Sequence, residues 1–244
     1  MEFTYEAYRG LLRKLKEYDY AISDYYNYEN YDKAAILRHD VDFSVSKAID
    51  FAKIENEEDV RGTYFVLLST DFYNVNSKET LKGLKELQRL GGKIGLHYDE
   101  TKYDIRNTEQ FVESVLKEKK MLEYALETEI SVVSMHRPSK WILEQRIDIP
   151  GMKNSYDPLF FEEFKYISDS RRCWREDVET IVASNLYNRL QILTHAFWYD
   201  EQEKTAKQAL SDFVRFAKWE RYRGLSDNVR DIEEFIREED LRGI

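Results

Sequence analysis

Short apolar runs alternate along most of the chain with segments whose apolar positions recur at helical spacing. The segment after the first run places its apolar residues at i, i+3, i+4 and i+7: Val45, Ala48, Ile49 and Ala52. This alternation is typical of repeated β-α units around a mostly parallel sheet. The runs predict six strands, at residues 34–39, 63–68, 93–97, 130–135, 165–167 and 190–194.

Cap residues and helix breakers predict most of the remaining elements. Asn76 stands three residues before Glu79, which predicts a capped helix ending at the glycine pair 91–92. Asn107 is predicted to cap a helix over residues 108–126. Residues 143–164 hold two of the three prolines and little periodicity, which predicts a long connection over one end of a barrel. An opening helix over residues 5–15 is expected to close the bottom of that barrel, and two helices are expected at the C-terminus.

Length and composition favour one domain. A chain of 244 residues with 42% hydrophobic residues can bury one sizeable core. We therefore expect a single domain over residues 1–244, with a core at about 34–200 and C-terminal helices at about 201–240.

Charge and cysteine content exclude several function classes. The net charge of −10 and the lack of a basic stretch argue against general affinity for nucleic acid or for anionic membranes. A single cysteine, Cys173, excludes an internal disulfide and a thiolate zinc site, which fits a reducing compartment. The sequence contains no run of 18 apolar residues and no apolar signal-peptide core near its start. We expect a cytoplasmic protein without a membrane span.

The four histidines of the sequence all fall at or just past the end of a predicted strand. They are His39, His97, His136 and His195. The loops after the strands build the active site of α/β barrels, so we expect the four imidazoles to meet at one mouth. A single histidine in such a place is more often structural, but the coincidence of all four favours a functional site.

Two aspartates follow the first of these strands. Asp40 and Asp42 are two residues apart, so both carboxylates of an extended segment can face the same side. One of them can bind a metal while the other accepts a proton from water. The alternative is that one of the two only caps the helix that begins near Ser44.

Charged residues also accompany two of the other histidines. Asp99 and Glu100 follow His97, and imidazole with carboxylate suits zinc and other first-row divalent ions. Arg137 follows His136, and an arginine in such a place can hold a carboxylate in a fixed orientation.

These segments resemble the motifs of the polysaccharide deacetylase superfamily, carbohydrate esterase family 4, in order and spacing over residues 34–200. The matching segments are Arg38-His39-Asp40-Val41-Asp42, Ile94-Gly95-Leu96-His97, His136-Arg137-Pro138, Asp169 and Leu193-Thr194-His195. The His-Asp-Val-Asp form is similar to a subgroup found among bacterial surface polysaccharide and O-antigen biosynthesis proteins. The resemblance implies an α/β fold, a distorted barrel of about seven strands. It also implies a metal-dependent hydrolase that removes an N-acetyl or similar acyl group from an amino-sugar substrate.

The resemblance also implies roles for individual residues. It implies a divalent metal ion, with zinc preferred, bound by Asp42 and His97, while Asp40 acts as base; the reverse assignment of the two aspartates stays open. His195 would be the acid, and Arg137 and Asp169 would orient the base and the acid. The family repeats its metal-binding histidine four residues on, where this chain has Thr101. His136 is therefore the first candidate for the third ligand, followed by Asp99 and Glu100.

Three tryptophans lie close to the motifs and are expected either to stack on a sugar ring or to serve only in packing. They are Trp141, Trp174 and Trp198. Three alternatives to the deacetylase hypothesis stay open: an inactive sugar-binding relative, a deacylase or deformylase of a non-polysaccharide amide, and a structural protein.

Overall fold

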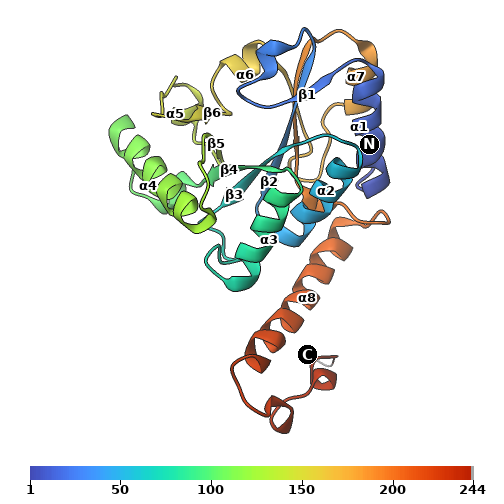
Figure 1. The fold of residues 1–244 in the computed structure, drawn as a ribbon, viewed down its shortest axis with the longest axis vertical. Helices are drawn as coiled ribbons and strands as arrows, with labels where there is room; N and C mark the ends of the chain where they lie inside the picture. Colours follow the sequence, from blue (N-terminus) through green and yellow to red (C-terminus); the bar gives the residue numbers. More distant parts are fainter. Residues whose placement is uncertain (243–244) are drawn as a thin grey trace. The chain divides into compact units, whose positions relative to one another are not determined.

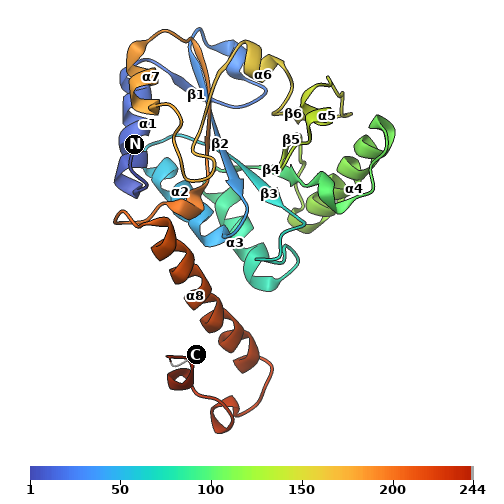
Figure 2. The ribbon, with the colours of Figure 1, turned by 180° about the vertical axis from the view of Figure 1, so that it is seen from behind.

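The computed structural model describes residues 1–242, and the strands of this range form one parallel sheet (Figures 1 and 2). The sheet order is β6-β5-β4-β3-β2-β8-β7, and β1 pairs with the first half of β2. The prediction of an α/β fold with about seven strands is confirmed. The strands are β1 Ala21–Ser23, β2 Ala34–Val41, β3 Thr63–Leu67, β4 Lys93–Tyr98, β5 Val132–Met135, β6 Lys153–Asn154, β7 Lys165–Ser168 and β8 Arg189–Thr194.

Helices connect the strands. The two views from opposite sides show α1, α2 and α3 along one face of the strands (Figures 1 and 2). The α-helices are α1 Tyr5–Glu17, α2 Val45–Glu57, α3 Lys78–Arg89, α4 Thr108–Leu126, α5 Lys140–Leu143, α6 Leu159–Glu162, α7 Val178–Ser184 and α8 Ala206–Ser226. The 3-10 turns are η1 Tyr28–Asn30, η2 Glu100–Lys102, η3 Ala196–Trp198, η4 Ile232–Glu234 and η5 Glu238–Arg242.

Local capping decides where the helices begin. The Asn107 side chain accepts a hydrogen bond from the backbone N–H of Gln110, so α4 begins where the sequence predicts. The cap predicted for α3 is wrong by one residue. Ser77, rather than Asn76, accepts the bond from the N–H of Thr80.

The sheet curls strongly. Asp42 follows the end of β2 and His136 follows the end of β5, and three strand spacings separate these positions, which is roughly 14 Å in a flat sheet. The Oδ1 atom of Asp42 nevertheless lies 3.3 Å from Nδ1 of His136. The end strands β6 and β7 do not pair with each other within residues 1–242, so the sheet is an open, distorted barrel.

Alternation along β2 separates two cores. The inward residues Ala34 and Ile36 belong to an apolar cluster inside the curl that also contains Phe65 and Phe160. The outward residues of β2 pack with the helices of the outer layer in a second cluster. We call the cluster inside the curl the inner core and this second cluster the outer core. Because side chains two apart share a face, the inner row runs from apolar residues at one end of β2 to charged residues at the other.

His39 belongs to the outer row, so the expectation that all four histidines meet at one mouth is wrong. Its Nδ1 lies 2.6 Å from Oγ1 of Thr194, and its Nε2 lies 2.7 Å from Oε1 of Glu55. Glu55 also accepts bonds from the hydroxyls of Tyr8 and Tyr64. Burial raises the pKa of Glu55, but the charge of His39 and the hydrogen bonds from His39, Tyr8 and Tyr64 together outweigh burial and hold the pKa of Glu55 below its usual value. This histidine therefore anchors α1, α2 and β8 behind the site.

Two further predictions about connections are corrected. Helix α1 does not close the bottom of the barrel, because its buried residues join the outer core and Lys14 forms an ion pair with Glu179 at 3.0 Å. Residues 143–164 do not form a plain connection. They contain β6 and α6, and the latter inserts Phe160 into the inner core.

Contacts between Cα atoms divide the chain into two compact units, Met1–Gln202 and Glu203–Ile244. The second unit contains one long helix, α8, which begins at a capping box formed by Thr205 and Gln208. Short 3-10 turns follow α8. Two C-terminal helices were expected, but residues 203–242 contain one α-helix. The assignment of residues 1–244 to a single domain stays a prediction. Within the described part of the chain, no helix is both long and apolar enough to span a bilayer.

The hydrogen bonds of the buried Glu55 predict that a substitution there lowers the stability of the fold strongly. Glu55→Gln should lower the free energy of unfolding by about 2–4 kcal/mol, because it replaces an oxygen that accepts two hydrogen bonds by an amide donor. Glu57→Gln, on the same helix and 60% exposed, is the matched control and should change it by less than about 1 kcal/mol. Urea unfolding measures both, and equal effects would contradict the role assigned to Glu55.

Candidate metal centre

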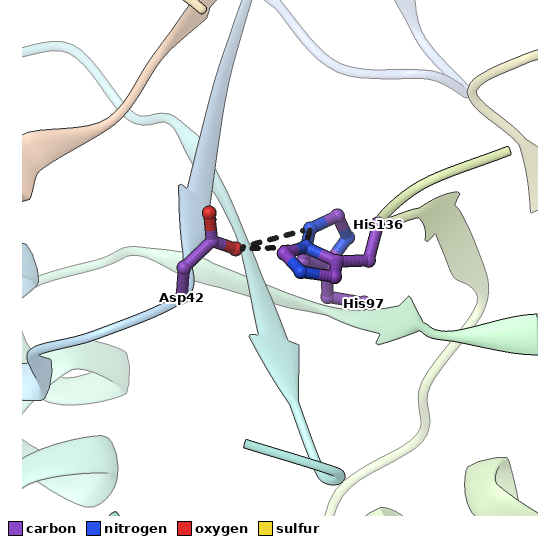
Figure 3. Close-up of side chains that lie close together, drawn as sticks. All are labelled: Asp42, His97 and His136. Carbon is purple, nitrogen blue, oxygen red and sulfur yellow. Dashed lines mark hydrogen bonds and ion pairs between the residues drawn. The ribbon is translucent and has the colours of Figure 1, made fainter. Parts of the chain in front are cut away.

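Three predicted ligands meet at the C-terminal ends of β2, β4 and β5 (Figure 3). Asp42 Oδ1 lies 3.2 Å from Nε2 of His97 and 3.3 Å from Nδ1 of His136. The two histidine nitrogens are 3.1 Å apart. The structure therefore brings together the set predicted from the sequence, with His136 in the third place.

This arrangement fits a divalent cation. Ligands at about 2.0–2.1 Å from a tetrahedral zinc ion are roughly 3.3 Å from one another, which is close to the three separations above. Asp42 Oδ1 is buried and accepts no hydrogen bond. A buried carboxylate oxygen without a donor, next to two imidazoles, is a set of atoms that could hold a divalent metal ion.

A hydrogen bond behind His97 sets its tautomer. Its Nδ1 lies 3.2 Å from the carbonyl oxygen of Ser134 on the neighbouring strand. A carbonyl oxygen only accepts, so Nδ1 carries the proton and Nε2 keeps its lone pair toward Asp42. The ring of His97 is thus oriented for a metal by the β4–β5 pairing.

Asp40 lies beside the three ligands but is bound by an arginine. Nε and Nη2 of Arg38 donate to its two carboxylate oxygens at 2.9 and 2.8 Å, and Oδ2 lies 3.6 Å from Nε2 of His97. Burial raises the pKa of Asp40, but the charge and hydrogen bonds of Arg38, together with the charges of His97 and His195, outweigh burial and lower the pKa. A carboxylate that is ionised, oriented and outside the ligand set is suited to accept a proton.

The predicted orienting residue, Arg137, does not hold Asp40. Arg137 is exposed, and in the described part of the chain it forms no hydrogen bond or ion pair with that carboxylate. Arg38 is completely buried, with its guanidinium 5.5 Å from the ring of Phe65 and 4.9 Å from that of Tyr156. The two-residue spacing in β2 that predicts a shared face for Asp40 and Asp42 also places Arg38 there, so the signal was present in the sequence.

His195 is held near the second carboxylate oxygen of Asp42 as a cation. Its Nδ1 lies 2.6 Å from Oδ1 of Asp169, as predicted, and its Nε2 lies 3.9 Å from Oδ2 of Asp42. The second oxygen of Asp169 accepts bonds from the backbone N–H of His195 and the hydroxyl of Tyr199. Burial lowers the pKa of His195, but Asp169 outweighs it and raises the pKa to about 9. The side chain is therefore protonated at neutral pH.

The remaining candidates lie around the centre without joining it. Asp99 caps η2 and Glu100 accepts a hydrogen bond from the backbone of Ser139, so neither replaces His136 as a ligand. The three tryptophans are half-buried and pack against the outer core: Trp141, Trp174 and Trp198. The packing role weighed for them accounts for these contacts.

No family model matches this chain, and no curated protein matches it. Solved structures do. A CE4 family pseudoenzyme from Bacillus anthracis is 15% identical, with a TM-score of 0.46 over 78% of this chain and 62% of its own length. The chitin deacetylase from Colletotrichum lindemuthianum is also 15% identical, with a TM-score of 0.45 over 74% and 80% of the two chains. A polysaccharide deacetylase from Bacillus cereus has 15% identity and a TM-score of 0.42 over 77% and 88%. The match thus spans less than two thirds of the Bacillus anthracis chain.

The pair of His195 and Asp169 predicts a loss of stability in alkali. The pKa of His195 is near 9 in the folded protein and near the ordinary 6.5 in the unfolded chain. The stabilisation is therefore fully present below about pH 6.5 and is lost as the pH rises through about 9, by on the order of 3 kcal/mol. Urea unfolding of the metal-free protein across this window measures it.

Asp169→Asn is the control for that measurement, because it removes the charge that holds the proton on His195. The variant should be less stable at neutral pH and should show a much flatter decline between about pH 6.5 and about pH 9. Parallel declines in the two proteins would show that another group causes the loss.

Proposed function

We propose that this protein is a divalent-metal-dependent hydrolase that removes an acetyl group from the amine of an amino sugar. One observation carries the proposal. Asp42, His97 and His136 form a ligand set, and it is flanked by an ionised carboxylate, Asp40, and by a protonated imidazole, His195. Amide hydrolysis needs both a base and an acid, and the two groups are held in the required protonation states.

Asp40 is suited to the first proton transfer. A bound zinc ion would supply Lewis-acid polarisation of the acyl oxygen and a lowered pKa for water. The free lone pairs of the Asp40 carboxylate can accept the proton of the attacking water, while Arg38 prevents the carboxylate from rotating. This division favours Asp40 as base and Asp42 as ligand.

His195 is suited to the second proton transfer. An amine leaves poorly unless it is protonated, and Nε2 of His195 carries a proton toward Asp42. Asp169 fixes the ring through Nδ1 and keeps the imidazolium charged. With a base and an acid both beside Asp42, one protein can complete both steps of hydrolysis.

The finer assignments rest on the motif resemblance. They are zinc as the metal, an N-acetylated glycan precursor as the substrate, a role in surface polysaccharide or O-antigen biosynthesis, and a cytoplasmic location. Arg137, exposed beside His136, is available to contact an anionic part of such a substrate.

One variant at the end of β2, at Asp40, and one just past it, at Asp42, separate metal binding from proton transfer. Asp42→Asn should lower zinc affinity at least about tenfold and abolish acetate release, since it removes an anionic ligand. Asp40→Asn should retain one zinc per chain but release acetate about 10²–10⁴-fold more slowly. Zinc titration and acetate release from N-acetylated glucosamine oligomers measure the two effects.

Two outcomes would contradict the proposal. An Asp40→Asn variant as active as the parent would exclude Asp40 as base. A fully zinc-loaded parent that binds N-acetylated sugars but releases no acetate would indicate a non-catalytic binding protein. Formate release from N-formylated sugars, measured alongside, would instead redirect the activity to another acyl group.

A further inference from the structure

Three aromatic rings form a stack beside the candidate site. The rings of Tyr156 and Phe161 are 5.6 Å apart at 29°, and those of Phe161 and Tyr166 are 5.0 Å apart at 47°. Tyr156 follows β6, Phe161 lies on α6 and Tyr166 lies on β7. The stack therefore spans the opening between the two end strands of the curled sheet.

The first ring is tied to the catalytic base through one guanidinium. The ring centroid of Tyr156 is 4.9 Å from Cζ of Arg38, and its hydroxyl lies 3.5 Å from Nη2. The same Nη2 donates to Oδ2 of Asp40 at 2.8 Å. Arg38 is completely buried, and its guanidinium contacts both the Tyr156 ring and the Asp40 carboxylate.

The middle ring, Phe161, is partly open to solvent, unlike its neighbours on the same segment. Phe161 is 39% exposed, whereas Phe160 and Phe164 are 1% and 3% exposed and fill the inner core. Tyr156 and Tyr166 are half-buried. Packing of the inner core thus accounts for Phe160 and Phe164 but not for the exposed part of the Phe161 side chain.

We propose that Tyr156, Phe161 and Tyr166 form a stacking platform for a pyranose ring of the substrate. One face of a pyranose presents several C–H groups, which pack favourably on an aromatic side chain. The platform rests on the proposed function for its position, since Arg38 links it to the base. In this proposal these three rings bind the sugar, and Trp141, Trp174 and Trp198 contribute only to packing.

The test measures sugar binding without turnover. Tetra-N-acetylchitotetraose is titrated calorimetrically into zinc-loaded protein that carries His195→Asn in every sample to stop hydrolysis. Adding Phe161→Ala should weaken binding about tenfold, and Phe161→Trp should restore it, because the ring rather than the volume is needed. Zinc affinity should stay unchanged, because the candidate metal ligands are Asp42, His97 and His136. The melting temperature should fall modestly in Phe161→Ala, which loses two ring contacts, and recover in Phe161→Trp.

Tyr124→Ala on α4, at a ring that is 89% exposed, is the matched control and should bind the sugar normally. Equal binding by the parent and Phe161→Ala, or no binding by the parent at millimolar sugar, would overturn the platform. A different outcome would contradict the proposed hydrolase function without contradicting the platform. Weakened binding in Phe161→Ala with no acetate release from the unmutated protein would retain the platform and reject the hydrolase.

Discussion

The alternation of side chains along β2 is the constraint on which the rest of the site depends. Arg38, Asp40 and Asp42 are two residues apart and therefore face the inside of the curled sheet, while His39 faces the helices. One extended segment thus carries, in order, the arginine that holds Asp40, the proposed base Asp40 and the candidate metal ligand Asp42. A shift of β2 by one residue would exchange this row for His39 and its apolar neighbours.

The curl of the sheet supplies the other half of the centre. Strands β4 and β5 bring His97 and His136 to the end of β2, and β8, on its other side, brings His195. Each buried charge has a partner: Arg38 holds Asp40, and Asp169 holds His195. Only Asp42 Oδ1, among the acidic atoms of this group, is buried without a donor, which marks it as the position that requires a cation.

Several strands and the candidate metal ligands were predictable from the sequence, because the periodicity of apolar residues and the position of a residue at the end of a strand are local signals. They identified β2, β3, β4 and β8 closely, and they selected Asp42, His97 and His136 as a group. The errors have physical causes. Ending the first strand at His39 hid the outward direction of that side chain, which only the continued alternation to Val41 reveals. β1 and β6 are three and two residues long, too short to show a period. The aromatic stack depends on the curl, which no local pattern encodes.

The most direct test of the account is a crystal structure of the zinc-loaded protein, with the ion located by its anomalous signal. The account predicts one zinc ion per chain, coordinated by Asp42, His97 and His136, with Asp40 still bound by both donors of Arg38 and outside the coordination sphere. A zinc ion coordinated by Asp40 in place of Asp42, or the absence of zinc from these three residues at saturating concentration, would contradict it.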